Sequence, residues 1–339
     1  MLHFLNCSDT IEQLGGAFIM LSYKTHLGEC YCGDSHSLIV EQLEDDSVDL
    51  VVTSPPFALL RQKEYGNENQ YKYIDWLCEF AELLLPKLKD TGSLVIDLGA
   101  AYNKGEPTYS LYQFKTLIKL CDEVGYKLAQ PFYWHNTSAL PAPIEWVNKR
   151  KLRAKNSVNT VWWLSKTSNP KADVTKVLTP YSDRMLKLFE KPDEFFKQGA
   201  KRPSGHTMDS WSNNNGGAIP PNLLQIPNSE SNSLYLRCCK EVKIKAHPAR
   251  FPIQLPEFFI NFLTDSSDLV VDIFAGSNTT GATCEKLSRR WKSFELSLDY
   301  VAPSSFRFLN DNTGATYVYE KLKIQSLLIS LFKQQNQGQ

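Results

Sequence analysis

Apolar positions along the chain follow two alternating periods. From residue 28 onward, short apolar runs at 28–34, 48–54 and 93–99 alternate with segments of helical spacing at 35–44 and 73–88. Alternation of strands with amphipathic helices is typical of βα units, whose strands pair in parallel. The pattern therefore predicts an α/β fold built on a mostly parallel sheet.

The same alternation resumes further along the chain, with one interruption. A helical segment at 112–125 ends in a glycine, and apolar runs at 126–135 and 159–165 are spaced like an antiparallel pair that closes the sheet. Residues 169–245 are polar, rich in turn formers and without a clear period, and a helix pattern returns at 252–263. An irregular insert thus separates two α/β parts.

Composition adds a few constraints. The 339 residues include 37 basic and 37 acidic side chains, so any nucleic-acid surface has to be local. The eight cysteines include no Cys-x-x-Cys pair, which argues against a zinc site or a disulfide framework and favours reduced thiols. The first residues lack the basic start of a signal peptide, and no apolar run approaches the roughly 18 residues that span a bilayer. We expect a metal-free protein of the cytoplasm.

The stretch VDLVVTSPPF, residues 48–57, ends a strand on two prolines. Neither Pro55 nor Pro56 has an N–H for a strand ladder, and each ring restricts φ. The strand therefore ends in a rigid turn that begins at Ser54. A stiff turn without any ligand is one interpretation of this motif, and a rigid site at the strand end is the other.

The segment DLVVDIFAGSNTTG, residues 268–281, predicts a buried strand, a glycine loop and the start of a helix. The spacing of Gly276 and Gly281 matches a P-loop, but Ala282 stands where the lysine would be, so triphosphate chemistry is not expected. A dinucleotide fingerprint needs a glycine where this chain has Asn278, which tolerates left-handed backbone but adds bulk.

Two further interpretations of this loop need no phosphate. A loop that binds an amino-acid-bearing nucleoside requires close backbone approach and an acid at the end of the next strand for the ribose hydroxyls. Glu295 meets the second requirement, because it lies 23 residues after Asp272, near the expected spacing of about 20. The other interpretation is a strand-to-helix turn that binds nothing.

Together these motifs resemble those of the S-adenosylmethionine-dependent DNA methyltransferases that modify exocyclic amino groups. TSPPF is similar to the family's catalytic motif, and DIFAGSNTTG is similar to its methionine-binding motif, with Asn278 in place of a common glycine. HPARFPIQL (247–255) and GDS (33–35) resemble the segment that helps close the cofactor site and the acidic motif near the cofactor's adenine. The catalytic motif comes first, which is the family's beta arrangement.

The resemblance implies a circularly permuted, Rossmann-like sheet with a closing antiparallel hairpin and an inserted target-recognition region. It divides the chain into an N-terminal extension (1–19), a catalytic half (20–168), the target-recognition region (169–245), a cofactor-binding half (246–325) and a C-terminal tail (326–339). The catalytic residues that it implies are Ser54, Pro55, Pro56 and Phe57. The residues implied to bind S-adenosylmethionine are Asp34, Thr53, Phe251, Pro252, Asp272, Phe274, Ala275, Gly276, Ser277, Asn278, Thr279 and Glu295.

The residue types of the catalytic motif suit methyl transfer to an amino nitrogen. Such a nitrogen is a poor nucleophile because its lone pair is delocalised into the base, and hydrogen-bond acceptors around its hydrogens favour a tetrahedral nitrogen. The Ser54 hydroxyl and a carbonyl fixed by the prolines are such acceptors, and alignment of the bound reactants does the rest. Phe57 offers a flat face to a base flipped out of the duplex. No cysteine follows a proline, which argues against cytosine C5 methylation.

The resemblance implies cytosine N4 as the target, because Ser-Pro-Pro-Phe accompanies cytosine N4 in most members and Asp-Pro-Pro-Tyr accompanies adenine N6. It further implies the site CAGCTG with its inner cytosine modified, duplex DNA as partner, a cognate restriction endonuclease in a restriction-modification system, and a monomer. Adenine N6 is the alternative target. Methylation of RNA or of a protein amide is more distant, and a DNA-binding protein without turnover is the alternative from another class.

Basic residues concentrate in two stretches that are candidates for contacts with DNA phosphates. Between residues 148 and 171 there are seven basic residues and no acidic one, namely Lys149, Arg150, Lys151, Arg153, Lys155, Lys166 and Lys171. The second group is Lys197, Lys201, Arg202 and His206. A solvated loop would show the same composition. His247 is expected to be structural.

Overall fold

The structure is a computed structural model, and it describes residues 11–14, 17–58, 70–191 and 214–324. The chain forms two compact units: residues 172–221 are one, and the rest of the chain is the other. The larger unit contains the sheet and every predicted site residue, so it is the unit that positions the chemistry.

The larger unit is organised around a ten-stranded sheet with the order β1-β2-β3-β10-β9-β4-β5-β7-β6-β8. Five neighbouring strands in its centre are parallel: β3 (Gly28–Cys32), β10 (Arg290–Glu295), β9 (Leu269–Asp272), β4 (Val48–Thr53) and β5 (Leu88–Leu98). The outer strands are β1 (Ile11–Leu14), β2 (Ala17–Lys24), β7 (Val158–Ser165), β6 (Lys127–His135) and β8 (Leu223–Gln225). The predicted α/β class with a mostly parallel sheet is confirmed.

The predicted antiparallel pair closes one side of the sheet. β7 pairs antiparallel with β5, and β6 pairs antiparallel with β7, with His135 opposite Val158. β8 then adds to β6 in parallel. On the other side, β2 pairs antiparallel with β3, and β1 with β2, so the predicted boundary after residue 19 falls inside the strand Ala17–Lys24.

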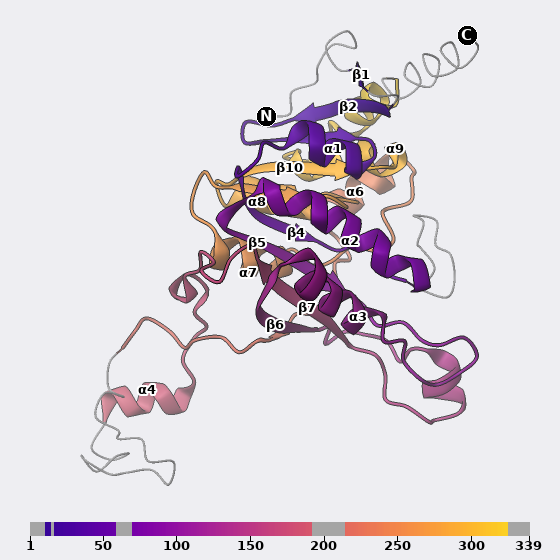
Figure 1. Cartoon of the computed structure of the whole chain (residues 1–339). Coiled ribbons are helices and arrows are strands. Elements are labelled where there is room, and N and C mark those ends of the chain that lie inside the picture. Colours follow the sequence, from indigo (N-terminus) through magenta and orange to yellow (C-terminus); the bar gives the residue numbers. More distant parts are fainter. Residues whose placement is uncertain (1–10, 15–16, 59–69, 192–213, 325–339) are drawn as a thin grey trace. The chain divides into compact units, whose positions relative to one another are not determined.

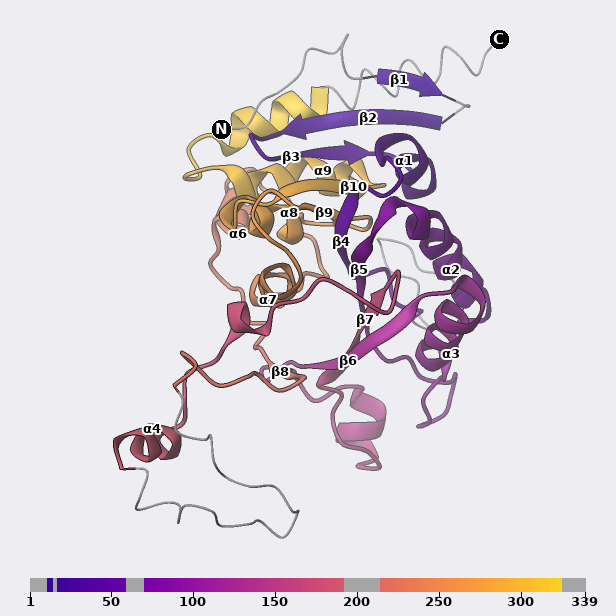
Figure 2. The same cartoon turned by 60° about the vertical axis from the view of Figure 1, so that its left-hand side comes forward.

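Helices cover both faces of the sheet (Figures 1 and 2). One face carries α1 (Ser35–Gln42), α2 (Gln70–Lys87) and α3 (Tyr112–Lys119), and the other carries α6 (Leu234–Glu241), α7 (Gln254–Leu263), α8 (Thr279–Lys286) and α9 (Leu298–Ser304). Parallel sheets are buried in this way because their crossovers place helices on both sides. All six residues of β4 are accordingly buried, and the functional groups of this strand emerge only where it ends.

The predicted helix at 112–125 changes its period in its second half. α3 continues as a π-helical turn at Leu120–Val124 and ends at Gly125, where the backbone has a left-handed φ of 104°. The Gly125 N–H donates to the Leu120 carbonyl at 3.1 Å. A Cβ would make this conformation costly, so the glycine ends the helix as predicted.

The smaller unit lies inside the predicted target-recognition region. It contains a 3₁₀ turn at Val174–Val177 and α4 (Asp183–Glu190), and Thr179 forms an antiparallel bridge with Ala218. Residues 222–245 of that region belong to the larger unit and include β8 and α6. The functional division of the chain into five parts stays a prediction.

Some features of the sequence lie beyond these elements. The second basic group, Lys197, Lys201, Arg202 and His206, lies outside the described residues. Within the described ranges, no helix has both the length and the apolar character needed to cross a membrane.

Candidate active site

Two loops meet at the carboxyl edge of the parallel strands. TSPPF follows β4, and the glycine loop follows β9, which pairs in parallel with β4. In open α/β sheets this edge is where ligands bind. Thr53 Oγ1 donates to Asp272 Oδ1 at 2.8 Å and so ties the last residues of the two strands together. Motifs that are far apart in the sequence are therefore adjacent in space.

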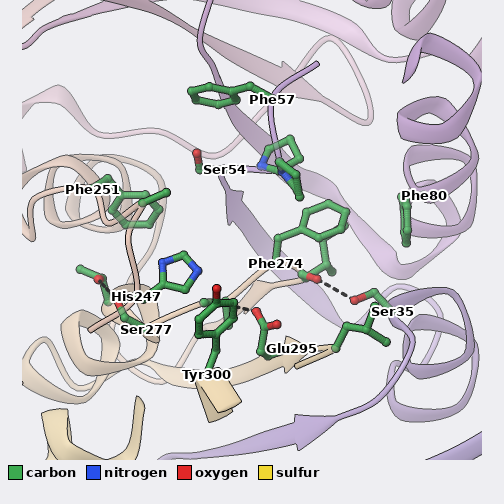
Figure 3. Close-up of a pocket in the computed structure, with 18 of the residues that line it drawn as sticks. Ser35, Ser54, Phe57, Phe80, His247, Phe251, Phe274, Ser277, Glu295 and Tyr300 are labelled. Atoms are coloured by element: carbon green, nitrogen blue, oxygen red, sulfur yellow. Dashed lines mark hydrogen bonds between the residues drawn. The ribbon is translucent and has the colours of Figure 1, made fainter. Parts of the chain in front are cut away.

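A cavity of about 390 Å³ lies between these loops (Figure 3). The predicted site residues that line it are Asp34, Ser54, Pro55, Pro56, Phe57, Phe251, Phe274, Ala275, Gly276, Ser277, Thr279 and Glu295. Figure 3 shows Ser54 and Phe57 at one end and Glu295 and Tyr300 at another. The predicted residues that do not line the cavity are Thr53, Pro252, Asp272 and Asn278.

Asp272 holds the glycine loop from inside the core. Its buried carboxylate accepts hydrogen bonds from Thr53 Oγ1, from Thr280 Oγ1 at 2.6 Å and from the Phe274 N–H at 3.1 Å. Burial raises the pKa of Asp272, and these hydrogen bonds oppose the rise because they favour the carboxylate. Asp272 therefore shapes the loop without forming part of the cavity wall.

Asn278 has the left-handed backbone that its residue type tolerates, with φ of 53°. Its Oδ1 accepts the Gly281 N–H at 3.0 Å and the Ser293 hydroxyl at 2.8 Å, and its Nδ2 donates to the Tyr23 hydroxyl at 3.0 Å. The side chain is fully buried. The Asn278 side chain, which replaces the glycine of a dinucleotide fingerprint, thus points into the core and caps α8.

Glu295 joins the glycine loop to the end of β10. Its Oε2 accepts the Gly276 N–H at 2.8 Å, and its Oε1 accepts the Ser297 N–H at 2.8 Å. Burial raises the pKa of Glu295, and these backbone hydrogen bonds lower it. Gly276 has a left-handed φ of 52°, and a Cβ there would lie 3.1 Å from the His247 ring. Both the left-handed conformation and the limited space beside the His247 ring therefore favour glycine.

His247, which the sequence pattern suggested to be structural, lines the cavity. Its ring meets the Tyr300 ring edge-on, with centroids 4.3 Å apart. Burial lowers the pKa of His247 to about 4, so the imidazole is neutral near pH 7. His247 is the first residue of the segment HPARFPIQL, which the resemblance implies helps to close the cofactor site. Nothing in the sequence pattern singled out His247 among the residues of that segment.

Asp97 is a site residue that the sequence motifs did not identify. Its Oδ2 accepts a hydrogen bond from Ser54 Oγ at 3.1 Å, and its Oδ1 accepts one from Asn159 Nδ2 at 3.0 Å. Burial raises the pKa of Asp97 to about 7, and the two hydrogen bonds lower it. In the sequence, Asp97 is a single acid within the apolar run SLVIDLG. This pattern does not show which residue the acid contacts.

Aromatic rings form another part of the cavity wall. The Phe80 and Phe274 rings meet edge to face with centroids 5.0 Å apart, and Trp76 lies 5.4 Å from Phe274. The His36 ring stacks on Phe80 with centroids 3.8 Å apart. Helical spacing predicts that α2 has a buried face, but not that Trp76 and Phe80 reach the glycine loop.

The basic stretch between residues 148 and 171 is divided between two edges of the sheet. Lys166 and Lys171 follow the end of β7 that pairs with the beginning of β5, where they form ion pairs with Asp46 and Asp268. The five other cations lie in the connection between β6 and β7, at the carboxyl edge. Of the seven cations in this stretch, these five therefore lie at the edge of the sheet that contains the cavity.

Metal ligation finds no support in the described ranges, which contain no group of three or more His, Cys, Asp or Glu side chains able to hold a metal ion. The cysteines in these ranges are free thiols. Metal independence stays a prediction.

The fold and this site define a DNA methylase, and the chain belongs to that family: the sequence model of the DNA methylase family matches residues 48–305. Type II methyltransferase M.PvuII of Proteus hauseri is 60% identical over 305 residues, 89% of this chain and 90% of that protein. M.BglII of Bacillus subtilis is 24% identical over 281 residues, 82% of this chain and 68% of that protein. The predicted family is thereby confirmed, and the chain is a DNA methyltransferase.

Solved structures agree with this assignment. The PvuII DNA methyltransferase, described as cytosine-N4-specific, superposes with a TM-score of 0.73 at 50% identity, covering 90% of this chain and 94% of that one. A Thermus thermophilus protein described as a DNA modification methylase, solved in complex with S-adenosyl-L-methionine, has a TM-score of 0.52 at 19% identity, covering 86% of this chain and 96% of that one. The second similarity establishes a shared fold.

Proposed function

We propose that this enzyme transfers a methyl group from S-adenosylmethionine to the exocyclic N4 of a cytosine that is flipped out of duplex DNA. The observation that carries the proposal is the Ser54–Asp97 hydrogen bond at the mouth of a cavity whose opposite end is lined by the glycine loop. The similarity to the cytosine-N4-specific PvuII enzyme supports the choice of base.

The cavity suits S-adenosylmethionine in shape and chemistry. The aromatic wall that includes Phe80 and Phe274 offers apolar contact to an adenine, and the Glu295 carboxylate at the end of β10 offers acceptors to ribose hydroxyls. Gly276 allows close approach of the backbone to the amino-acid portion. When bound, this cofactor supplies a sulfonium methyl group. Thr53, Asp272 and Asn278 contribute by fixing the loops, as their buried hydrogen bonds indicate.

Ser54 acts as an oriented acceptor for the substrate amino group. When Asp97 is ionised it has no proton to donate, so the Ser54 hydroxyl must direct its own hydrogen to Asp97. The lone pairs of Ser54 Oγ are then free to accept a hydrogen of the amino group, which localises the nitrogen lone pair for attack. Pro55 and Pro56 hold this geometry because their φ angles are fixed.

Phe57 provides the stacking surface for the flipped base. The ring packs directly on Gly99, where a Cβ would lie 2.2 Å from the ring carbons. Glycine at position 99 therefore leaves room for the Phe57 ring in the cavity wall. Stacking on an aromatic side chain offsets part of the cost of removing a base from the duplex, which is a few kcal/mol.

The finer points of the proposal follow the sequence resemblance. They are the palindrome CAGCTG with its inner cytosine as target, a functional link to a cognate restriction endonuclease, action as a monomer, metal independence and a cytoplasmic location. The free thiols and the similarity to a Type II enzyme are consistent with this setting.

Nucleoside mass spectrometry tests the function. The full chain is incubated with S-adenosylmethionine and two duplexes that differ only in whether they contain CAGCTG, and the DNA is digested to nucleosides. N4-methylcytosine in the CAGCTG duplex alone is the expected result. N6-methyladenine would overturn the base assignment, and N4-methylcytosine in both duplexes would overturn the site. Absence of any methylated base, with the cofactor still bound, would favour a DNA-binding protein without turnover.

A further inference from the structure

The connection between β6 and β7 extends from the catalytic edge of the sheet. These residues, 136–157, are called the β6–β7 loop here; they follow His135 and precede Val158, which pair across the two strands. Two residues after the loop ends, Asn159 donates to Asp97, the partner of Ser54. Figures 1 and 2 show the loop extending away from the sheet beyond β6 and β7. Its root is therefore built into the active site.

The β6–β7 loop presents an exposed apolar side chain on a backbone that is held on either side. Leu140 is 81% exposed, the largest fraction among the large apolar side chains of the described residues. The carbonyls on either side of it are held, because Lys155 Nζ donates to the Ala139 carbonyl at 2.9 Å and the Asn156 N–H donates to the Ala142 carbonyl at 3.0 Å. Ordering an apolar side chain in water brings no gain by itself, so this arrangement favours a partner that covers it.

A second set of hydrogen bonds links the loop to the cavity wall. Asn136 Oδ1 accepts the Ser138 N–H at 3.1 Å and the Asn228 N–H at 3.0 Å. Asn228 Nδ2 in turn donates to the carbonyl of Arg250, which lines the cavity. The beginning of the loop is thus connected to a residue of the cavity wall.

The charge of the loop indicates the partner. The loop contains a single acid, Glu145, against five cations, namely Lys149, Arg150, Lys151, Arg153 and Lys155, although the whole chain is neutral. The Lys149 and Arg150 side chains are 70% and 58% exposed, even with Glu145 paired to both. Exposed cations and an exposed leucine on the same loop match a partner with a phosphate backbone and an apolar interior, which is duplex DNA.

We propose that the β6–β7 loop binds duplex DNA beside the target cytosine and that Leu140 enters the space from which the base is flipped. The inference rests on the proposed function, since it requires a base to leave the duplex. Apolar wedges of this kind separate neighbouring bases in other protein–DNA complexes, and filling the vacated space stabilises the flipped state. The cations of the loop contact the flanking phosphates.

Fluorescence of 2-aminopurine tests this role without requiring turnover. The probe replaces the target cytosine and is placed opposite thymine so that it stays paired, and the increase in emission on binding of protein with S-adenosylhomocysteine reports unstacking. We expect a large increase with the parent chain and an increase about tenfold smaller with Leu140→Ala. The matched control is Leu128→Ala, because Leu128 is also an exposed leucine of this sheet, at 40%, but lies at the opposite end of β6. It should behave like the parent.

A second comparison uses methyl transfer to a paired or mismatched target. Leu140→Ala should lower kcat/KM about tenfold when the cytosine is paired with guanine, and much less when it is mispaired, because a mispaired base leaves the stack more easily. The dissociation constant of S-adenosylmethionine should stay within about twofold of the parent value, since the β6–β7 loop is remote from the glycine loop in sequence and in the sheet.

Several results would overturn the inference. They are an equal emission increase for Leu140→Ala and the parent, no increase with the parent itself, or an equal loss of kcat/KM on both duplexes. A concentration-dependent dimer that Leu140→Ala dissociates would instead assign Leu140 to a contact between two copies. Nucleoside analysis of the parent reports separately on the proposed methylation, so failure of the function and failure of the wedge are distinguishable.

Discussion

The loops after β4 and β9 are neighbours at one edge of the sheet, yet they are held in different ways. The glycine loop is fixed by buried polar groups on several sides, whereas the catalytic loop is stiffened by two prolines, is tied to Asp272 through Thr53 and contacts Asp97 through Ser54. A loop whose backbone approaches a ligand needs its conformation set by other residues. In the proposed function the Ser54 hydroxyl accepts a hydrogen bond from the substrate amino group, and its own hydrogen bond to Asp97 orients it for that contact.

Arg307 makes this contrast clearer. Its Nε donates to the Ser277 carbonyl at 2.7 Å, and its Nη2 donates to the Ser277 hydroxyl at 3.0 Å. Burial lowers the pKa of Arg307, while its partner Glu230 raises it. Together with Glu295 and Asp272, this cation holds the glycine loop from three directions. No comparable set is described around Ser54, Pro55 and Pro56.

The largest effect is expected from removing the Ser54 hydroxyl of the catalytic loop. Ser54→Ala deletes the proposed acceptor of the substrate amino group but leaves the glycine loop unchanged. We expect kcat to fall by about 10²- to 10³-fold, as on removal of a single catalytic hydrogen-bonding group, while the dissociation constant of S-adenosylmethionine changes by less than about twofold. Single-turnover methylation and equilibrium dialysis measure the two quantities.

Ser47→Ala is the matched control, because Ser47 precedes β4 at the opposite edge and its hydroxyl donates to the Glu44 carbonyl at 2.7 Å. Its kcat should match that of the parent. Unchanged turnover in Ser54→Ala, or an equal loss in both variants, would contradict the role given to Ser54.

A smaller effect is expected at the glycine loop, where a substitution should weaken cofactor binding and leave kcat largely unchanged. Glu295→Ala removes the acceptor of the Gly276 and Ser297 N–H groups and the proposed partner of the ribose. We expect the dissociation constant of S-adenosylmethionine to rise by about 10- to 100-fold, which corresponds to one or two charge-assisted hydrogen bonds, with kcat at saturating cofactor largely retained. Isothermal titration calorimetry measures the constant.

Glu257→Ala serves as its control, since Glu257 forms an exposed ion pair with Lys286 on α7 and α8. Equal dissociation constants for Glu295→Ala and the parent would refute the assignment of Glu295. A loss of kcat without a change in the dissociation constant would assign Glu295 a catalytic role. It would then no longer be true that the glycine loop serves cofactor binding and the catalytic loop serves turnover.

The smallest effect is a dependence on pH. Since burial raises the pKa of Asp97 to about 7, the carboxylate that orients Ser54 is lost as the pH falls below 7. Single-turnover rates should therefore rise about tenfold from pH 5.5 to 7 and level off above it. Asp97→Asn should be slower and independent of pH in this range. A flat profile for the parent would argue against the ionised form as the working state.

The stability of the fold should change with pH in the other direction. The pKa of Asp97 is higher in the folded chain than its ordinary value of 3.8, so the folded state binds the proton more tightly. The contribution of Asp97 to the free energy of unfolding therefore falls as the pH rises from about 4 to 7. Thermal melts of the parent and Asp97→Asn over this range provide the measurement.

Local patterns were sufficient for much of the architecture. The strand–helix alternation, the helix end at Gly125 and the position of both loops at strand ends were all predictable, because periodicity and backbone restrictions act over a few residues. The position of the basic residues at 149–171 was not predictable, since composition does not show which cations form ion pairs with acids. Lys166 and Lys171 are paired at one edge, while Lys155 fixes the β6–β7 loop at the other.

The sequence by itself determined the fold class, the two motifs and the chemistry that they imply, because each of these is encoded in contiguous residues. Only the tertiary structure decided that Asp97 faces Ser54, that Trp76 and Phe80 reach Phe274, and that Leu140 is exposed on the β6–β7 loop. Periodicity shows that a residue lies on a buried face or in a loop, but its partner depends on how whole elements pack, and contacts between distant segments follow from the order and register of the strands.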